Sequence, residues 1–170
     1  NGRQVVHNKE RVELRFEEIP GPTFDGLPMN NYLSPYPIIP VLQSRGCYWG
    51  KCTFCTHSFV YGHRYGKQKT HGMVDELEAL MKKYNTKYFT FSDEAMSPHA
   101  LNDVSELMIE RGVEISSLAL LKFEKVMDEK LFTKMKKAGF NFLMFGLESA
   151  NDRALALIDK GTTKEAEKDV

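Results

Sequence analysis

The sequence has no long apolar run, no excess of charge of either sign and few cysteines. A helix that spans a bilayer needs ~20 predominantly apolar residues, and no such run is present. Basic and acidic residues number 23 each, so no overall positive field favours binding to nucleic acid. The three cysteines are an odd number without a preceding secretory segment, which disfavours a disulfide framework. We therefore expect a cytoplasmic protein without membrane or nucleic-acid partners.

The first part of the chain differs in composition from the rest. Five of the seven prolines lie between Pro20 and Pro37, and prolines interrupt regular elements. Upstream of them, Val12, Leu14 and Phe16 alternate with charged residues, which predicts a short edge strand. We expect residues 1–36 to be a linker with an edge strand that follows a preceding domain; a plain N-terminal arm is the alternative. Residues 37–170 form the main body.

From residue 37 onward, predicted strands alternate with predicted helices. Apolar runs predict strands at Ile38–Leu42, Tyr88–Phe91, Glu114–Leu121 and Phe140–Leu147. Between them, apolar residues recur at helical spacing, and the methionines at these positions are expected in the core. Repeated strand–helix units imply parallel strands and right-handed crossovers. A closed barrel and an open doubly wound sheet both fit this pattern. No G-x-G-x-x-G follows a strand, which weakens the dinucleotide-binding option.

Helix ends are also marked in the sequence. Thr70, Ser97 and Asp128 are predicted N-caps, and Pro98 suits the first position of its helix. Gly112 and Gly139 are predicted to end two of these helices. A short helix is expected around Leu155 and Ile158, and Thr162–Glu165 resembles a capping box that opens another helix.

Chemically active residues follow each predicted strand. The first strand leads into a cysteine loop, and the later strands end in the groups Asp93–Glu94, Lys122–Glu124 and Glu148–Ser149. In βα barrels the carboxyl ends of the strands form the rim on which active sites are built. The sequence therefore predicts a site at this rim.

All three cysteines, Cys47, Cys52 and Cys55, lie in one loop with C-x4-C-x2-C spacing. Two metal centres remain open on this pattern. Zinc accepts a Cys3His set, and His57 would complete one. An iron–sulfur cluster suits soft thiolates, and three ligands leave one iron open for chemistry. We favour the cluster, because zinc modules usually join two separated ligand pairs, and here all the candidates lie within a single loop.

Three motifs together resemble the radical S-adenosylmethionine enzymes. They are Ser44–Cys55 (SRGCYWGKCTFC), Phe91–Glu94 (FSDE) and Phe145–Ser149 (FGLES). The resemblance is greatest to the members that carry an N-terminal cobalamin-binding domain. It implies a partial (βα)6 barrel of TIM type. It also implies a [4Fe–4S] cluster that reductively cleaves S-adenosylmethionine to a 5′-deoxyadenosyl radical, with an electron donor such as flavodoxin or ferredoxin. Cobalamin in a preceding domain is a further candidate cofactor.

The resemblance also implies roles for particular residues, beginning with Cys47, Cys52 and Cys55 as cluster ligands. It places Phe54 near the adenine. The residues expected to contact other polar groups of S-adenosylmethionine are Asp93, Glu94, Lys122, Glu148 and Ser149.

The sequence departs from the family pattern at several points. The first cysteine spacing is x4 rather than the commoner x3, and no Gly-Gly-Glu follows the second strand. We also expect a barrel truncated after about four βα units. The last strand would then expose an apolar surface on Phe142, Met144 and Leu147.

Overall fold

The computed structural model describes residues 5–6, 15–60 and 64–170. Its main element is a four-stranded sheet, made of β1 (Ile38–Val41), β4 (Tyr88–Phe91), β5 (Ser116–Lys122) and β6 (Phe140–Gly146). The order is β1-β4-β5-β6 and every pairing is parallel. The predicted α/β class and parallel strands are confirmed, and the sheet forms part of a TIM-type barrel.

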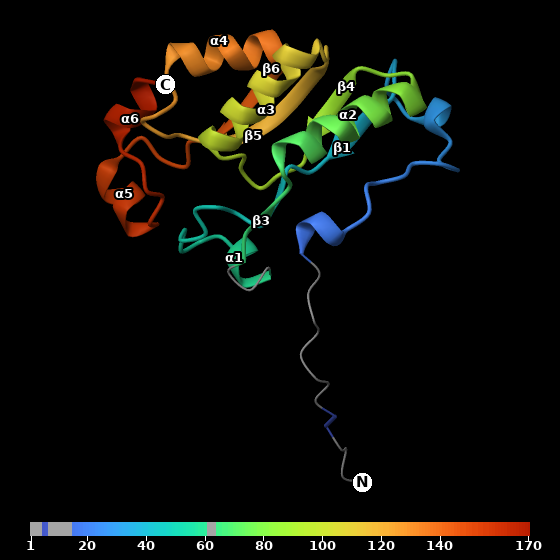
Figure 1. Ribbon diagram of the computed structural model, residues 1–170. Helices are drawn as coiled ribbons and strands as arrows, with labels where there is room; N and C mark the ends of the chain where they lie inside the picture. Colours follow the sequence, from blue (N-terminus) through green and yellow to red (C-terminus); the bar gives the residue numbers. More distant parts are fainter. Residues whose placement is uncertain (1–4, 7–14, 61–63) are drawn as a thin grey trace.

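Three amphipathic helices lie side by side on one face of this sheet (Figure 1). They are α2 (Thr70–Tyr84), α3 (Pro98–Arg111) and α4 (Glu129–Ala138). Each crosses from one strand to the next parallel strand, as a βα repeat requires. Their buried stripes meet the sheet in a core that includes Phe89, Phe91, Leu77 and Leu101. Met73, Met108 and Met135 are fully buried there, so the prediction that the methionines are core residues is confirmed for them.

The predicted helix ends are mostly confirmed. The side chains of Ser97 and Asp128 cap α3 and α4, which Gly112 and Gly139 end in left-handed conformation. The prediction for α2 was wrong, because Thr70 is the first helical residue and the N-cap is Lys69, which makes no side-chain capping bond. The start of the C-terminal helix was predicted one residue too early. Thr163, not Thr162, caps α6 (Lys164–Lys168) by accepting from the amide of Ala166.

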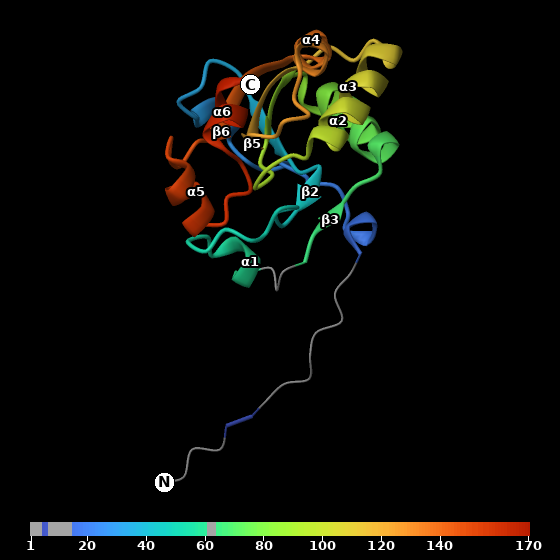
Figure 2. The same cartoon turned by 90° about the vertical axis from the view of Figure 1, so that its left-hand side faces the viewer.

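The remaining elements lie at the carboxyl end of the sheet and along the N-terminal arm. The two-residue strands β2 (Ser44–Arg45) and β3 (Gly66–Lys67) pair antiparallel on either side of the short helix α1 (His57–Val60). Figure 2 shows these elements together below the main sheet, with α5 (Asp152–Leu157) beside the cysteine loop. The arm contains the 3₁₀ turns η1 (Phe16–Glu18) and η2 (Met29–Asn31).

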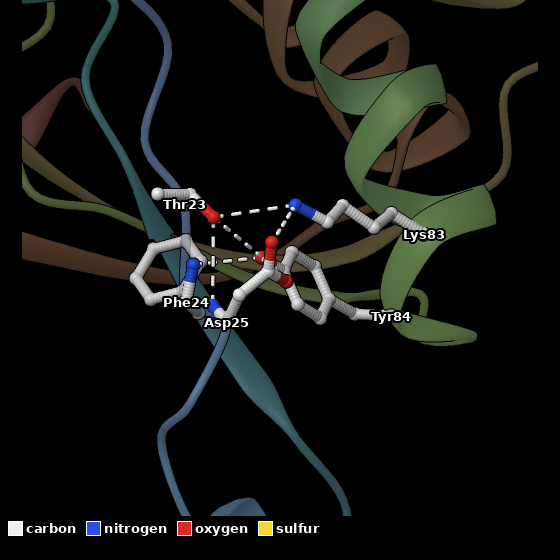
Figure 3. A network of polar contacts seen from close by, with 5 residues as sticks. All are labelled: Thr23, Phe24, Asp25, Lys83 and Tyr84. Atoms are coloured by element: carbon white, nitrogen blue, oxygen red, sulfur yellow. Dashed lines mark hydrogen bonds and ion pairs between the residues drawn. The ribbon is translucent and has the colours of Figure 1, made fainter.

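The N-terminal arm packs against the end of α2 (Figure 3). The Tyr84 hydroxyl accepts from the Phe24 amide at 2.7 Å and donates to Asp25 at 3.0 Å. The Lys83 ammonium donates to Asp25 at 2.5 Å and to Thr23 at 3.2 Å. Of the predicted edge strand, Val12 and Leu14 lie outside the described residues, and Phe16 belongs to η1 rather than to a strand. The domain boundary near residue 36 stays a prediction.

The expected apolar surface is exposed on β6 and just after it. Phe142 is 65% exposed, Met144 55% and Leu147 47%. In the part of the chain that the structure describes, β6 pairs only with β5. Within residues 5–6, 15–60 and 64–170, no helix combines the length and the apolar character needed to cross a membrane.

Candidate functional site

The cysteine loop lies between β2 and α1, at the carboxyl end of β1. Gly46 begins the turn with φ +82, and a Cβ there would lie 2.2 Å from the carbonyl oxygen of Arg64. Only glycine avoids this clash and tolerates this backbone conformation. Cys47, Cys52 and Cys55 follow as free thiols, each partly exposed. The sequence therefore folds here into a loop that presents three thiols from one side of the barrel rim.

The donor set of this loop fits an iron–sulfur cluster. Burial is the main cause that raises the pKa of Cys52, and negative charge on Cys47 and Cys55 raises it further, while Lys160 and Lys122 oppose the shift. The three sulfurs thus lie within electrostatic range of one another and of two cations. Among the described residues, no group of three or more His, Cys, Asp and Glu side chains converges on a single point as a one-ion site needs. A four-iron cluster instead spreads its ligands over separate irons, so three thiolates would hold three irons and leave the fourth open.

Asp93 anchors the backbone that leads into the loop. Its side chain is buried, and its two oxygens accept from the Gln43 amide at 3.0 Å and the Ser44 amide at 2.6 Å. The Ser44 hydroxyl donates to it as well, at 2.5 Å. Burial raises the pKa of Asp93, against the effect of these donors. Both oxygens therefore bind the backbone that leads into the cysteine loop, and the predicted contact of Asp93 with S-adenosylmethionine stays a prediction.

Glu94, the next residue, faces the helix that follows the cysteines. Its Oε2 lies 3.0 Å from Nε2 of His57. The end of β4 therefore contacts both sides of the cysteine loop, through Asp93 at its start and Glu94 after its end. The His57 imidazole therefore lies within hydrogen-bond distance of the Glu94 carboxylate, and the Glu94 side chain is partly exposed at the rim.

Lys122, at the end of β5, is held by several groups at once. Its ammonium donates to Glu124 at 2.9 Å and to the carbonyl of Gly161 at 3.1 Å, and lies 4.7 Å from the ring centroid of Trp49. The Tyr48 hydroxyl donates to the same Glu124 oxygen at 3.0 Å. Burial, and then Glu124, raise the pKa of Tyr48. The role predicted for Lys122, contact with a polar group of S-adenosylmethionine, would have to compete with these partners.

Glu148 and Ser149 lie just after β6, as predicted. Glu148 adopts the left-handed conformation with φ +58, and its Oε1 accepts from the buried Lys160 at 3.0 Å. The Ser149 hydroxyl accepts from the Asn151 amide at 3.2 Å. Sequence reasoning missed Lys160, because a single lysine in a polar turn has no spacing pattern that marks it as buried.

The turn after α5 lies directly against the cysteine loop. The Thr53 amide donates to the Ile158 carbonyl at 3.0 Å, and the Trp49 indole donates to the Asp159 carbonyl at 2.7 Å. These contacts join residues as much as 110 positions apart, and nothing in the local sequence signals them. Phe54, near the same turn, is 53% exposed, so its ring face is accessible for stacking.

A cavity of about 520 Å³ lies beside the rim, between the N-terminal arm and β1. Its lining combines apolar arm residues with polar groups, among them Phe16, Pro22, Glu76 and Glu94. Burial raises the pKa of Glu76, which accepts from Gln68 at 3.0 Å. Sequence reasoning did not find this cavity, because its two walls come from distant segments.

The structure thus brings the predicted residues to one edge of the sheet. The parallel pairing places the ends of β1, β4, β5 and β6 side by side, so thiols, carboxylates and lysines share one rim. It also distinguishes them by availability. Asp93 and Lys122 are buried among protein partners, whereas Ser149, Phe54 and Glu94, which also pairs with His57, keep exposed surface. Their functional roles stay predictions.

Comparison with known proteins gives a consistent result. The family model described as the Radical SAM superfamily matches residues 41–168. An uncharacterized methyltransferase of Pyrococcus horikoshii is 33% identical over 150 residues, which cover 86% of this chain and 32% of that protein. Bacteriochlorophyllide d C-12(1)-methyltransferase of Chlorobaculum tepidum is 27% identical over 131 residues, which cover 75% of this chain and 28% of that protein.

A third relative and a solved structure extend the comparison. Anaerobic magnesium-protoporphyrin IX monomethyl ester cyclase of Rubrivivax gelatinosus is 28% identical over 128 residues, 74% of this chain and 23% of that protein. The chain therefore spans about a third or less of the length of these relatives. The cobalamin-dependent S-adenosylmethionine radical enzyme OxsB, solved with aqua-cobalamin bound, shares the fold with a TM-score of 0.61. The two sequences are 20% identical, and the structural match covers 75% of this chain and 20% of that one.

Proposed function

Because the chain belongs to the radical SAM superfamily, we propose that Cys47, Cys52 and Cys55 hold a [4Fe–4S] cluster whose open iron binds S-adenosylmethionine. The observation that carries the proposal is the loop of three free cysteines at the carboxyl end of four parallel strands. When bound, such a cluster supplies the electron that cleaves the sulfonium and yields a 5′-deoxyadenosyl radical. The protein contributes binding and orientation.

The rim residues divide into two groups under this proposal. Glu94, Glu148 and Ser149 are candidates for the amino and ribose groups of S-adenosylmethionine, and Phe54 for the adenine face. Asp93 and Lys122 act indirectly, because their polar atoms already bind protein groups. The geometry supports a substrate-binding face on the exposed side of the rim and a supporting layer beneath it.

For the whole protein we propose methyl transfer or a related radical modification. Two of the relatives are named methyltransferases and the third a cyclase, and OxsB is named as cobalamin-dependent. Cobalamin held outside these residues is therefore a proposed second cofactor. The substrate is not assigned. A low-potential donor such as flavodoxin or ferredoxin would supply the electron, in the cytoplasm.

Metal analysis of the anaerobically purified full-length protein tests the cluster assignment. We expect a brown protein with about four irons per chain. Replacing any one of Cys47, Cys52 and Cys55 by Ala should abolish cluster assembly, because each thiolate is the only protein ligand of one iron. His57→Ala is the control and should keep its iron. A colourless protein with one zinc, lost equally on His57→Ala, would contradict the proposal.

Binding of S-adenosylmethionine is tested separately on the reduced protein. Its titration should change the electron paramagnetic resonance signal, and turnover should release 5′-deoxyadenosine, with S-adenosylhomocysteine as well if methyl transfer dominates. Glu148→Ala should weaken binding roughly ten- to a hundredfold, since a charge-assisted hydrogen bond contributes about 1.5–3 kcal/mol. Its iron content should stay unchanged. A wild-type signal that does not respond would exclude the open-iron model.

A further inference from the structure

The turn from Leu157 to Gly161 contacts the cysteine loop at successive positions. Its carbonyl oxygens at Ile158 and Asp159 accept from Thr53 and Trp49, at 3.0 and 2.7 Å. Thr53 is next to Cys52, and Trp49 lies between Cys47 and Cys52. Both donors therefore belong to the backbone segment whose shape decides where the sulfurs point.

Gly161 brings this turn into close contact with the loop. It has φ +68, and a Cβ at this position would lie 2.0 Å from Cζ2 of Trp49. The indole therefore occupies the space that a side chain at this position would need. An alanine at this position would push the ring, and the loop that carries it, away from the turn.

Lys122 joins the same contact from the end of β5. Only 5% of its side chain is exposed, and a buried ammonium is tolerated only when it is paired. Its partners are Glu124, the Gly161 carbonyl and the face of Trp49. The ammonium thus contacts both the turn and the loop, and its positive charge acts on Cys52 together with that of Lys160. Glu124 brings the compensating negative charge and also accepts from Tyr48.

We propose that Lys122 and the turn Leu157–Gly161 are a positioning device that fixes the cysteine loop in its ligand-holding shape, and that the Lys122–Glu124 pair sets the reduction potential of the group held there. The inference rests on the proposed function, because it requires a cluster in this loop. Lys122 is then a positioning residue beneath the loop rather than a ligand of S-adenosylmethionine.

The two members of the ion pair should shift the potential in opposite directions. Reduction adds one negative charge, which a neighbouring cation favours and a neighbouring anion opposes. Lys122→Met should lower the equilibrium constant for one-electron reduction about tenfold, a shift of ~59 mV to more negative potential. Glu124→Gln should shift the potential to more positive values. A purely structural role for the pair would not reverse sign between the two variants.

The test is a redox titration of the full-length, cluster-loaded protein, followed by electron paramagnetic resonance. Lys122→Arg should restore the wild-type potential, and Lys125→Met, which removes an exposed charge nearby, should leave it unchanged. Shifts in the same direction for Lys122→Met and Glu124→Gln, or none in either, would overturn the charge assignment. If Lys122→Met assembles no cluster, Glu124→Gln decides the matter: a shift to more positive potential, with Lys122→Arg at the wild-type value, supports the charge assignment, and no shift or a shift to more negative potential overturns it.

The positioning role is tested by a matched pair of glycine variants. Gly161→Ala should lose most of the bound iron, because the new methyl group displaces Trp49. Gly112→Ala is the control: Gly112 has φ +66 but open space around it, so it introduces similar backbone strain without the clash. Equal iron content in the two variants would contradict the positioning role of the turn Leu157–Gly161. A wild-type protein without a four-iron signal would instead contradict the proposed function.

Discussion

Two polar networks hold distant parts of this chain together, and they differ in their contact with solvent. At the rim, Asp93 binds the Gln43 and Ser44 amides in a buried setting. On the N-terminal arm, Asp25 binds Lys83 and Tyr84 at the molecular surface. Both networks join segments about fifty or sixty residues apart by carboxylate hydrogen bonds.

The same bonds have different consequences in the two places. At the surface, water replaces a lost partner, so an exposed ion pair contributes little. In the interior, a donor left without an acceptor bears its full desolvation penalty. The rim network is therefore expected to fix the cysteine loop, whereas the arm network fixes only how the arm lies against α2.

The largest expected effect is at the buried carboxylate. Asp93→Ala should destabilise the protein by about 3 kcal/mol, since it leaves the Gln43 and Ser44 amides without acceptors. Urea unfolding measures the loss, and hydrogen exchange of these two amides locates it. Asp93→Asn keeps one acceptor and should lose less. Equal stability of Asp93→Ala and wild type would remove the distinction between the two networks.

A smaller effect is expected at the part of the arm network that is only half exposed. Tyr84→Phe removes the acceptor of the Phe24 amide and should cost about 1 kcal/mol in the free energy of unfolding. Faster hydrogen exchange of the Phe24 amide should accompany the loss. If this variant proved as unstable as Asp93→Ala, the arm would be as important to the fold as the rim.

The two carboxylates should also differ in pH dependence. Burial raises the pKa of Asp93 above 3.8, so the native state binds this proton more tightly than the unfolded state does. The contribution of Asp93 to stability is therefore present below 3.8 and is lost as pH rises through the raised pKa. Hydrogen bonds from Lys83, then Tyr84, lower the pKa of Asp25, so its contribution is present above 3.8 and is lost as pH falls through the lowered value. Urea titrations on both sides of 3.8, comparing each Asp→Asn variant with wild type, should give slopes of opposite sign.

The smallest effect is expected at Asp25 itself. Asp25→Asn removes an exposed ion pair, and salt in the solvent weakens the attraction in such a pair. The small difference from wild type should therefore disappear in urea titrations at high ionic strength. Persistence of the difference at high salt would show that the contact depends on packing rather than charge.

The strands and the main helices were predictable because their signals are local. Buried positions repeat at fixed spacing in Tyr88–Phe91 and Thr70–Tyr84, and Ser97 and Asp128 cap helices within a few residues. The errors were local too. Lys69 precedes α2 although Thr70 is the better capping residue, and Phe16 continues an alternating pattern yet forms a 3₁₀ turn. Both expectations rested on weak local preferences, which the rest of the structure can override.

The candidate site was predictable only in part. Cysteine spacing and the charged residues after each strand located the rim, because parallel strands must end at one edge. The partners of those charged residues were not visible. Lys160 meets Glu148 from the far end of α5, and the carbonyl that binds Trp49 lies 110 residues away from it.

By itself, the sequence determined the three-cysteine loop, the parallel α/β architecture and the polar residues at the strand ends. Only the tertiary structure decided which of those residues are buried and which keep exposed surface. Asp93 and Lys122 have the same chemical groups as Glu94 and Lys125, but folding buries the first two among specific donors and acceptors. Burial and pairing arise from contacts between segments far apart in the chain, and such contacts leave no periodic trace in the local sequence.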